Sequence, residues 1–290
     1  MSDSPVFWAD NEDPEMQRAI KRARQTFRFF WREVSWEQRR IIPGLDVACV
    51  KVAFWDDGDP SDEDVPVEQM WVSDVDFDGA IITGTLINQP NWLNSVSEGD
   101  DVEIKPNQLS DWMYAINNKV FGAFTVNFIR SQMPKGERKA HDDAWGMDFG
   151  SPSEVKLVPP DFLGKGARSG SQTPAEVGAV EHPMALNMCE SLAEFASDPA
   201  NLNSTDDKGF TVLHSLALAG AAKGVSILLE HGADPTQPAA NGMTPAMLAK
   251  KLGWKQVQQV LADHGQRHPL GKIHRFCGRS VQIRRMLCVI

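Results

Sequence analysis

Gly209-Phe-Thr-Val-Leu-His214 and Gly242-Met-Thr-Pro-Ala-Met247 lie 33 residues apart and decide the fold of the second half of the chain. The same offset relates Gly220 to Gly253, Ile227-Leu228 to Val260-Leu261, and His231-Gly232 to His264-Gly265. A period of roughly 20 to 50 residues is typical of repeat architectures, in which each unit buries its apolar face against a neighbour. The pattern therefore predicts a stack of helical units in this part of the chain.

These units resemble the ankyrin repeat. Gly209-x-Thr211-Val212-Leu213-His214 stands where that family has G-x-T-P-L-H, and residues 228–235 stand where it has L-L-x-x-G-A-D-P. The second copy keeps Thr244-Pro245 but has Ala246-Met247, as expected of a terminal, capping unit. Because about three units are needed for stability, we expect a degenerate half-repeat upstream, at Met184–Asp206. The resemblance implies a protein-binding scaffold.

The first half of the chain shows a different pattern. Asp13-Pro14 is a helix start signal, and apolar residues then recur every three or four positions, at Met16, Ile20, Ala23, Phe27, Phe30 and Val34. Runs of β-forming residues follow at 47–54, 67–77, 80–87, 101–105, 112–116 and 120–129. Asp78-Gly79 and Asn117-Asn118 are turn signals between them. We predict an α+β fold, with the N-terminal helix packed on an antiparallel sheet, followed by an all-α ankyrin-repeat domain.

Six motifs run in order through this half. They are Ala19-Ile-Lys-Arg-Ala-Arg24, Val50-Lys-Val-Ala-Phe54, Glu68-Gln-Met-Trp-Val72, Gly84-Thr-Leu-Ile-Asn88, Asp111-Trp-Met-Tyr114 and Gly122-Ala-Phe-Thr125. The ordered set resembles the YegJ-like bacterial domain of unknown function. That family commonly has His where Gln69 stands, so any chemistry that this His performs in relatives is absent from this chain.

The composition divides the chain into four parts. We predict a YegJ-like α+β domain over residues 14–130, a Gly/Pro-rich linker over 131–183, ankyrin repeats over 184–265 and a basic tail over 266–290. The linker prediction rests on seven Gly and six Pro in 53 residues, with a short strand expected at 154–158. The tail has six Lys and Arg and no acidic residue. We expect the tail to fold back on the acidic domain or to cap the repeats, and binding to a membrane surface is the alternative.

The sequence has no recognisable catalytic motif. G-x-S-x-G, H-E-x-x-H, a Walker loop and G-x-G-x-x-G after a strand are all missing. His214 is expected to fix a turn of its repeat, and His141-Asp142-Asp143 is read as a solvated loop in preference to a metal site. We therefore expect no enzyme activity, no metal and no cofactor. Because no apolar run approaches the roughly 20 residues of a membrane span and no signal peptide is recognisable, we expect a cytoplasmic location.

Two surface features point to a binding site for a protein partner. The first is a run of six carboxylates in nine residues: Asp56, Asp57, Asp59, Asp62, Glu63 and Asp64. A solvated loop and a calcium site are the alternatives, and the spacing lacks the closing Glu of an EF-hand. The second is tryptophan usage, with nine Trp against one Tyr. Trp55 and Trp92 lie in or beside predicted loops, where exposed Trp is a frequent interface anchor, whereas Trp71 and Trp112 are expected in the core.

The predicted function is that of an immunity protein, which binds and neutralises a cognate bacterial toxin such as a nuclease effector of type VI secretion. YegJ-like domains and ankyrin repeats both resemble components of toxin–immunity loci, which is an analogy. Residues 1–130 contain 23 Asp and Glu against 12 Lys and Arg. This acidic surface suits a basic toxin, while it repels nucleic acid itself. The alternatives are an enzyme of unknown type in the YegJ-like domain and a regulatory adaptor for an endogenous protein.

Overall fold

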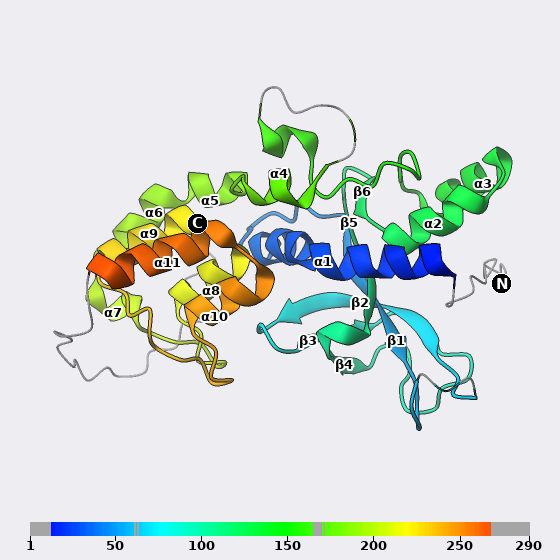
Figure 1. Cartoon of the computed structure of the whole chain (residues 1–290), viewed down its shortest axis with the longest axis horizontal. Coiled ribbons are helices and arrows are strands. Elements are labelled where there is room, and N and C mark those ends of the chain that lie inside the picture. The colour runs from blue at the N-terminus through cyan, green and yellow to red at the C-terminus, as the bar shows by residue number, and fades with distance from the viewer. Residues whose placement is uncertain (1–12, 61, 63, 165–169, 171, 268–290) are drawn as a thin grey trace. The chain divides into compact units, whose positions relative to one another are not determined.

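The computed structural model describes residues 13–60, 62, 64–164, 170 and 172–267 (Figure 1). The chain divides into two compact units. Unit 1 comprises Met1–Phe30, Gly44–Asp161 and Lys165–Pro174, and unit 2 comprises Trp31–Pro43, Phe162–Gly164 and Ala175–Ile290. Nearly all of the predicted basic tail, from residue 268 onward, lies outside the described residues, so the prediction made for it stays a prediction.

Unit 1 is built on a six-stranded antiparallel sheet with the order β4-β3-β2-β1-β5-β6. The strands are β1 (Val47–Phe54), β2 (Glu68–Phe77), β3 (Ile82–Leu86), β4 (Asp101–Ile104), β5 (Leu109–Ile116) and β6 (Lys119–Gly122). The predicted α+β class is therefore confirmed. Both predicted turns are also found: Asp78 Oδ1 accepts the amides of Ala80 and Ile81 at 2.7 Å, and Asn117 and Asn118 adopt positive φ angles of 49° and 61° between β5 and β6.

Helix α1 (Pro14–Glu37) begins where Asp13-Pro14 predicts. The Asp13 carboxylate accepts the Glu15 amide at 2.7 Å, which satisfies one of the amides that a helix start leaves unpaired. The apolar stripe packs on one face of the sheet. Trp112 Nε1 donates to the Ala23 carbonyl at 2.9 Å, and the Phe27 ring meets Phe77 edge-on with centroids 5.4 Å apart.

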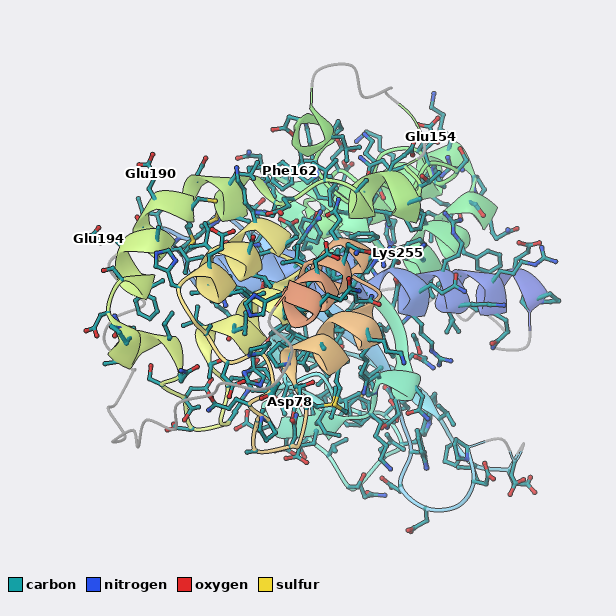
Figure 2. The ribbon with its side chains drawn as sticks, turned by 60° about the vertical axis from the view of Figure 1, so that its left-hand side comes forward. Asp78, Glu154, Phe162, Glu190, Glu194 and Lys255 are labelled. Carbon is teal, nitrogen blue, oxygen red and sulfur yellow. The ribbon has the colours of Figure 1, made fainter. Side chains whose placement is uncertain are left out.

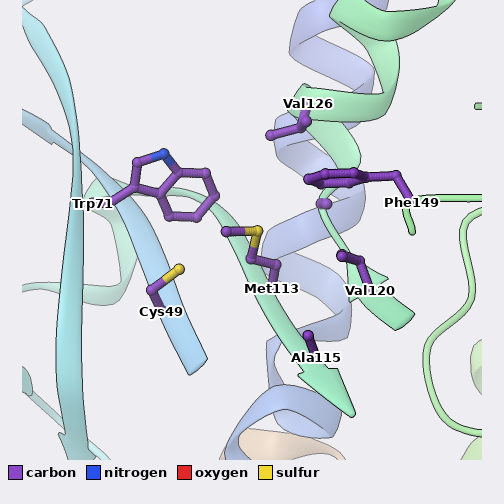
Figure 3. Packing of buried hydrophobic residues seen from close by; sticks show 8 residues of the cluster. Cys49, Trp71, Met113, Ala115, Val120, Val126 and Phe149 are labelled. Atoms are coloured by element: carbon purple, nitrogen blue, oxygen red, sulfur yellow. The ribbon is translucent and has the colours of Figure 1, made fainter. Parts of the chain in front are cut away.

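The alternate residues of the strands face away from α1 and form a second apolar cluster (Figure 3). Its members are Cys49, Trp71, Met113, Ala115, Val120, Ala123, Val126 and Phe149. Cys49 of β1 pairs with Met113 of β5, and Lys51 of β1 pairs with Trp71 of β2. These pairings bring the side chains of the three strands together on this face. Trp71 and Trp112 are both buried, so their predicted place in the core is confirmed.

The strand predicted at 120–129 is wrong in its second half. β6 ends at Gly122, and residues 124–132 form the helix α2 (Phe124–Gln132). The β-forming side chains of this stretch are overridden by a tertiary contact. The fully buried Asp111 carboxylate accepts the Phe124 amide at 2.9 Å and the Thr125 amide at 2.6 Å, and it thereby caps the first turn of α2.

Gly122 is needed at the end of β6. Its φ angle of 78° favours glycine. A Cβ atom on this residue would also lie 2.4 Å from both the ring and the carbonyl of Trp112. The Gly122-Ala-Phe-Thr125 motif therefore combines a close backbone approach with the helix cap.

Residues 131–183, predicted as a linker of irregular structure, contain helices. These are α3 (Lys135–Trp145), the 3-10 turn η2 (Pro160–Leu163) and α4 (Pro174–Gly178). The short strand expected at 154–158 is not formed. Instead, the carboxamide of Gln172 bonds the amides of Leu157 and Val158 at 2.8 and 3.0 Å, and Tyr114 Oη donates to the Leu157 carbonyl. Val155, Leu157 and Val158 are buried and belong to the core of unit 1.

Unit 2 has the predicted ankyrin-repeat fold. Its helices are α5 (Pro183–Asn187), α6 (Cys189–Ala196), α7 (Pro199–Leu202), α8 (Val212–Ala219), α9 (Ala222–Glu230), α10 (Pro245–Leu252) and α11 (Lys255–Arg267). Thr211 and Thr244 cap α8 and α10, and Gly220 and Gly253 end them with φ angles of 78° and 70°. The 33-residue offset of the sequence is therefore an offset between equivalent helix caps.

His214 has the architectural role that the repeat predicts. The imidazole is buried, and its Nδ1 lies 3.1 Å from the Thr211 amide and 2.8 Å from Thr211 Oγ1. Burial lowers the pKa of His214 and thereby favours the neutral ring. A neutral Nδ1 accepts the Thr211 amide and closes the start of α8.

The end of α1 belongs to unit 2. His182 Nε2 lies 3.0 Å from Glu33 Oε2, and its Nδ1 accepts the Met184 amide at 3.1 Å, which caps α5. The Trp36 ring stacks on the imidazole with centroids 5.7 Å apart. Glu33 and His182 are each only 2% exposed. The repeat helices are thus completed by residues that lie inside the predicted domain 14–130.

Replacement of Leu228, which is 0% exposed within α9, tests the repeat stack. We expect Leu228→Ala to lower the free energy of unfolding by about 2–5 kcal/mol, because it empties a core site. Leu186 is 47% exposed, so Leu186→Ala is the matched control and is expected to cost less than about 0.5 kcal/mol. Denaturant melting measures both, and equal small losses would contradict the packing.

Candidate functional site

Negative charge is concentrated on one part of unit 1. Residues 44–104, which span β1 to β4, contain 15 Asp and Glu and one basic residue, Lys51. On the edge strand β4, Asp101 and Glu103 are exposed while Val102 and Ile104 are buried. Charged side chains on an edge strand oppose pairing with other strands. The larger consequence is a negative potential that attracts positively charged macromolecules.

The predicted acidic loop forms the connection between β1 and β2. Asp56, Asp57, Asp59, Asp62 and Asp64 are all exposed, whereas Glu63 lies outside the described residues. The loop is partly organised by its own backbone, since the Asp62 amide donates to the Asp59 carbonyl and the Val65 amide to the Asp62 carbonyl. The side chains of Asp57, Asp59, Asp62 and Asp64 are accessible from solvent.

Asp56 differs from the rest of the run because it holds a second loop. Its carboxylate accepts the Asn94 amide at 2.9 Å and the Ser95 amide at 3.1 Å. Hydrogen bonds from Ser95 and Asn94 lower the pKa of Asp56, since they favour the charged form. Asp56, predicted as a partner contact, is therefore also a brace for the loop Asn91–Ser95.

Glu68 holds the same loop from the start of β2. Its carboxylate accepts the amides of Asn91, Trp92 and Leu93 at distances of 2.5–3.2 Å. Burial by itself raises the pKa of Glu68, but these hydrogen bonds outweigh it and the net pKa is lowered. The sequence analysis missed Glu68, because only the folded chain brings it to residues 23 to 25 positions away.

Trp92 sits on this braced loop and is 51% exposed. An exposed indole on a loop fixed by two carboxylates loses little conformational freedom on binding, which is what an interface anchor requires. Trp55 is placed differently. It is half-buried and lines a pocket of about 310 Å³ in unit 1. Trp55 is therefore placed to contact a side chain that enters the pocket. Trp92 is placed to insert into a pocket on another molecule.

The pocket is the second feature that the sequence did not reveal. It is lined by Gln17, Ile20, Arg24, Ala53, Trp55, Pro60, Val67, Gln69, Asn107, Gln108 and Ser110. The described lining residues offer carboxamides, the Trp55 ring, the Arg24 guanidinium and the Ser110 hydroxyl to an occupant.

His141 and Asp142 lie on α3 and not in the solvated loop that was expected. Asp142 accepts two hydrogen bonds from the guanidinium of the buried Arg130, at 2.8 and 2.6 Å, and His141 Nδ1 lies 3.0 Å from Asp142 Oδ1. These contacts give both residues a structural role. Across the part of the chain that the structure describes, no three His, Cys, Asp or Glu side chains gather in a way that could hold a metal ion.

Fold and surface together define a two-part protein, in which an acidic α+β unit accompanies an ankyrin-repeat unit. Residues 13–149 match the family described as "Uncharacterized protein conserved in bacteria (DUF2314)", and residues 178–272 match the ankyrin repeats. The repeats indicate a role in protein–protein interaction. In the described residues, no helix is both long and apolar enough to cross a membrane.

Two bacterial relatives place the chain further. It is 38% identical over 262 residues to "Putative ankyrin repeat protein NMB1133/NMB1171" of Neisseria meningitidis serogroup B, which covers 90% of this chain and 98% of that protein. The chain belongs to the same family as this Neisseria protein. It is also 29% identical over 92 residues to "Uncharacterized protein YegJ" of Escherichia coli K12, covering 32% of this chain and 56% of that protein.

A pair of neighbouring residues tests the brace. We expect Asp56→Ala to speed hydrogen exchange at the amides of Asn94 and Ser95, because both lose their acceptor. Asp57→Ala removes the same charge from the next position and should leave these two amides unchanged. Amide exchange followed by NMR measures both variants, and equal exchange rates in the two would contradict the role of Asp56.

Proposed function

We propose that this chain is a protein-binding immunity protein, which acts in the cytoplasm and neutralises a cognate basic toxin. The observation that carries the proposal is the exposed Trp92 on a braced loop, within a segment that has 15 acidic residues and one basic residue. Ankyrin repeats, which are protein-binding elements in general, occupy the other unit. We propose that the partner is a toxin, and a nuclease of type VI secretion is one candidate.

We assign different roles to the acidic loop and to Trp92. The exposed carboxylates Asp57, Asp59, Asp62 and Asp64 lie in solvent, so they act on the rate of encounter more than on the lifetime of the complex. Trp92 buries apolar surface on contact and supplies affinity. A basic protein meets both conditions, and a nuclease is basic where it binds phosphate. Nucleic acid itself is repelled by the same surface.

Removal of negative charge from the loop tests whether the loop speeds association with the partner. The structure decides which carboxylates to change. Asp57, Asp59, Asp62 and Asp64 are changed together to Asn, while Asp56 is spared because it braces the Trp92 loop. We expect the association rate with the partner to fall about tenfold or more at low salt, with little change in the dissociation rate. Added salt should slow the wild type more than the variant, since exposed charges are screened beyond about 8–10 Å. Stopped-flow binding measures both rates.

The control removes an equal charge from unit 2. Glu190 and Glu194 project outward from α6 (Figure 2), and Glu230 and Asp207 are also exposed. Changing these four to Gln and Asn should leave the association rate within about twofold of wild type. If the control set slows association and the loop set does not, the ankyrin unit is the contact surface and the proposed site is wrong.

The toxin itself is identified by its effect on growth. The full chain, purified from the bacterium that produces it, should retain one stoichiometric partner. We expect expression of that partner alone to arrest growth, and co-expression with the chain to restore it. Trp92→Ala should weaken the complex by more than about 1 kcal/mol and reduce the protection. A partner that is harmless when expressed alone would replace the immunity role with that of an adaptor.

A further inference from the structure

The pocket beside the acidic loop has walls of two kinds. Ile20, Trp55, Pro60 and Val67 supply apolar surface, and carboxamides are among the groups that supply polar surface. One carboxamide belongs to the wall itself: Gln108 receives the Lys105 amide at 3.0 Å and donates to the Ala53 carbonyl at 3.4 Å. Gln69 and Asn107 are two further carboxamides of the lining.

Gln69 lacks part of its expected bonding. Its side-chain oxygen is buried and makes no hydrogen bond. A buried acceptor without a donor is costly, and such groups in native proteins commonly mark a site that something else completes. Rotation of the Gln69 carboxamide within the pocket would let it form two hydrogen bonds with a peptide group. The carboxamide NH2 would donate to the peptide carbonyl, and the carboxamide oxygen would accept from the peptide N–H.

Charge restricts the occupant further. Among the described lining residues, Arg24 is the one that carries a charge, and its Nε donates to the Leu109 carbonyl at 2.6 Å, which fixes the guanidinium at the pocket. A lysine or arginine side chain would meet this cation. A carboxylate would meet the negative potential of the surrounding segment 44–104. A neutral group is therefore favoured, and an aromatic ring can use both the Trp55 indole and the Arg24 cation.

We propose that the pocket formed by α1, β1, β2 and the turn η1 (Pro106–Gln108) receives a neutral aromatic side chain and the adjoining main-chain amide of the protein partner. The inference rests on the proposed function, because the occupant belongs to that partner. Trp92 and the pocket then form two complementary contacts. The Trp92 indole packs against the partner, and an aromatic ring of the partner packs inside the pocket. Anchor residues in pockets commonly dominate the affinity of an interface.

The test uses small probes, so it does not depend on the identity of the partner. The full chain is titrated with N-acetyltryptophanamide, which is neutral and carries a ring and peptide-like amides, and with its charged analogues tryptamine and N-acetyltryptophan. Ligand-observed NMR gives each dissociation constant. We expect saturable binding that is tightest for the neutral probe. Absence of saturable binding, or tighter binding of either charged analogue, overturns the proposal.

Variants assign the binding to this pocket. Gln69→Leu keeps the size of the side chain and removes its hydrogen bonds, so it should weaken the neutral probe roughly tenfold. Asn107→Ala, at an exposed position, should also weaken it and keeps the test valid if Gln69→Leu fails to fold. Gln132→Leu alters a glutamine on α2 outside the pocket and should have no effect. Equal affinities for the pocket variants and this control overturn the proposal.

The same variants separate this inference from the proposed function. If Asn107→Ala and Gln69→Leu weaken both the probe and the partner, the pocket is the anchor site. If they weaken the probe and leave the partner unaffected, the partner does not use the pocket and the inference is wrong, while the immunity role stands. If the partner proves harmless to growth, the immunity role fails, and the probe titration still reports on the pocket.

Discussion

The Asp111 carboxylate is the interaction on which much of unit 1 depends. It is fully buried and accepts the amides of Trp112, Phe124 and Thr125 together with Thr125 Oγ1, at 2.6–2.9 Å. Burial raises its pKa, while these hydrogen bonds lower it and offset part of the cost of desolvation. Asp111 lies on β5 and accepts the first amides of α2, so it fixes the direction of the chain after β6. Arg130 at the end of α2 in turn bonds Asp142 and holds α3.

Local patterns predicted the elements that are governed by local chemistry. Apolar spacing predicted α1, turn-forming residues predicted the hairpin turns, and the offset of 33 residues predicted the repeats. The pattern failed at 124–129, where β-forming side chains fold as a helix because Asp111, 13 positions earlier, supplies the cap. It failed again at 135–145, where the Gly and Pro of the surrounding stretch concealed a helix. For α2 the deciding contact is with strand β5, which local sequence does not reveal.

The candidate site shows the same limit. Exposure of the acidic loop could be inferred from its composition, since six carboxylates in nine residues cannot be buried together. The different role of Asp56 could not, because its acceptor geometry depends on amides 38 and 39 positions away. The pocket around Gln69 was equally hidden, since α1, β1, β2 and η1 each contribute only a few of its residues. The sequence also could not distinguish Trp55, which lines the pocket, from Trp92, which is exposed on the loop Asn91–Ser95.

The division of α1 has a consequence for how such proteins are inherited. The boundary between the units falls between Phe30 and Trp31, inside one continuous helix. A genetic exchange that transferred only the repeat-coding region would therefore lose Glu33 and Trp36, and His182 would be left as a buried imidazole without its carboxylate and its stacking ring. A break between the two family matches, after residue 149 and before residue 178, would separate Glu33 and Trp36 from the repeats. The Neisseria relative aligns over 98% of its length, as expected if the two parts pass between lineages as a single heritable block.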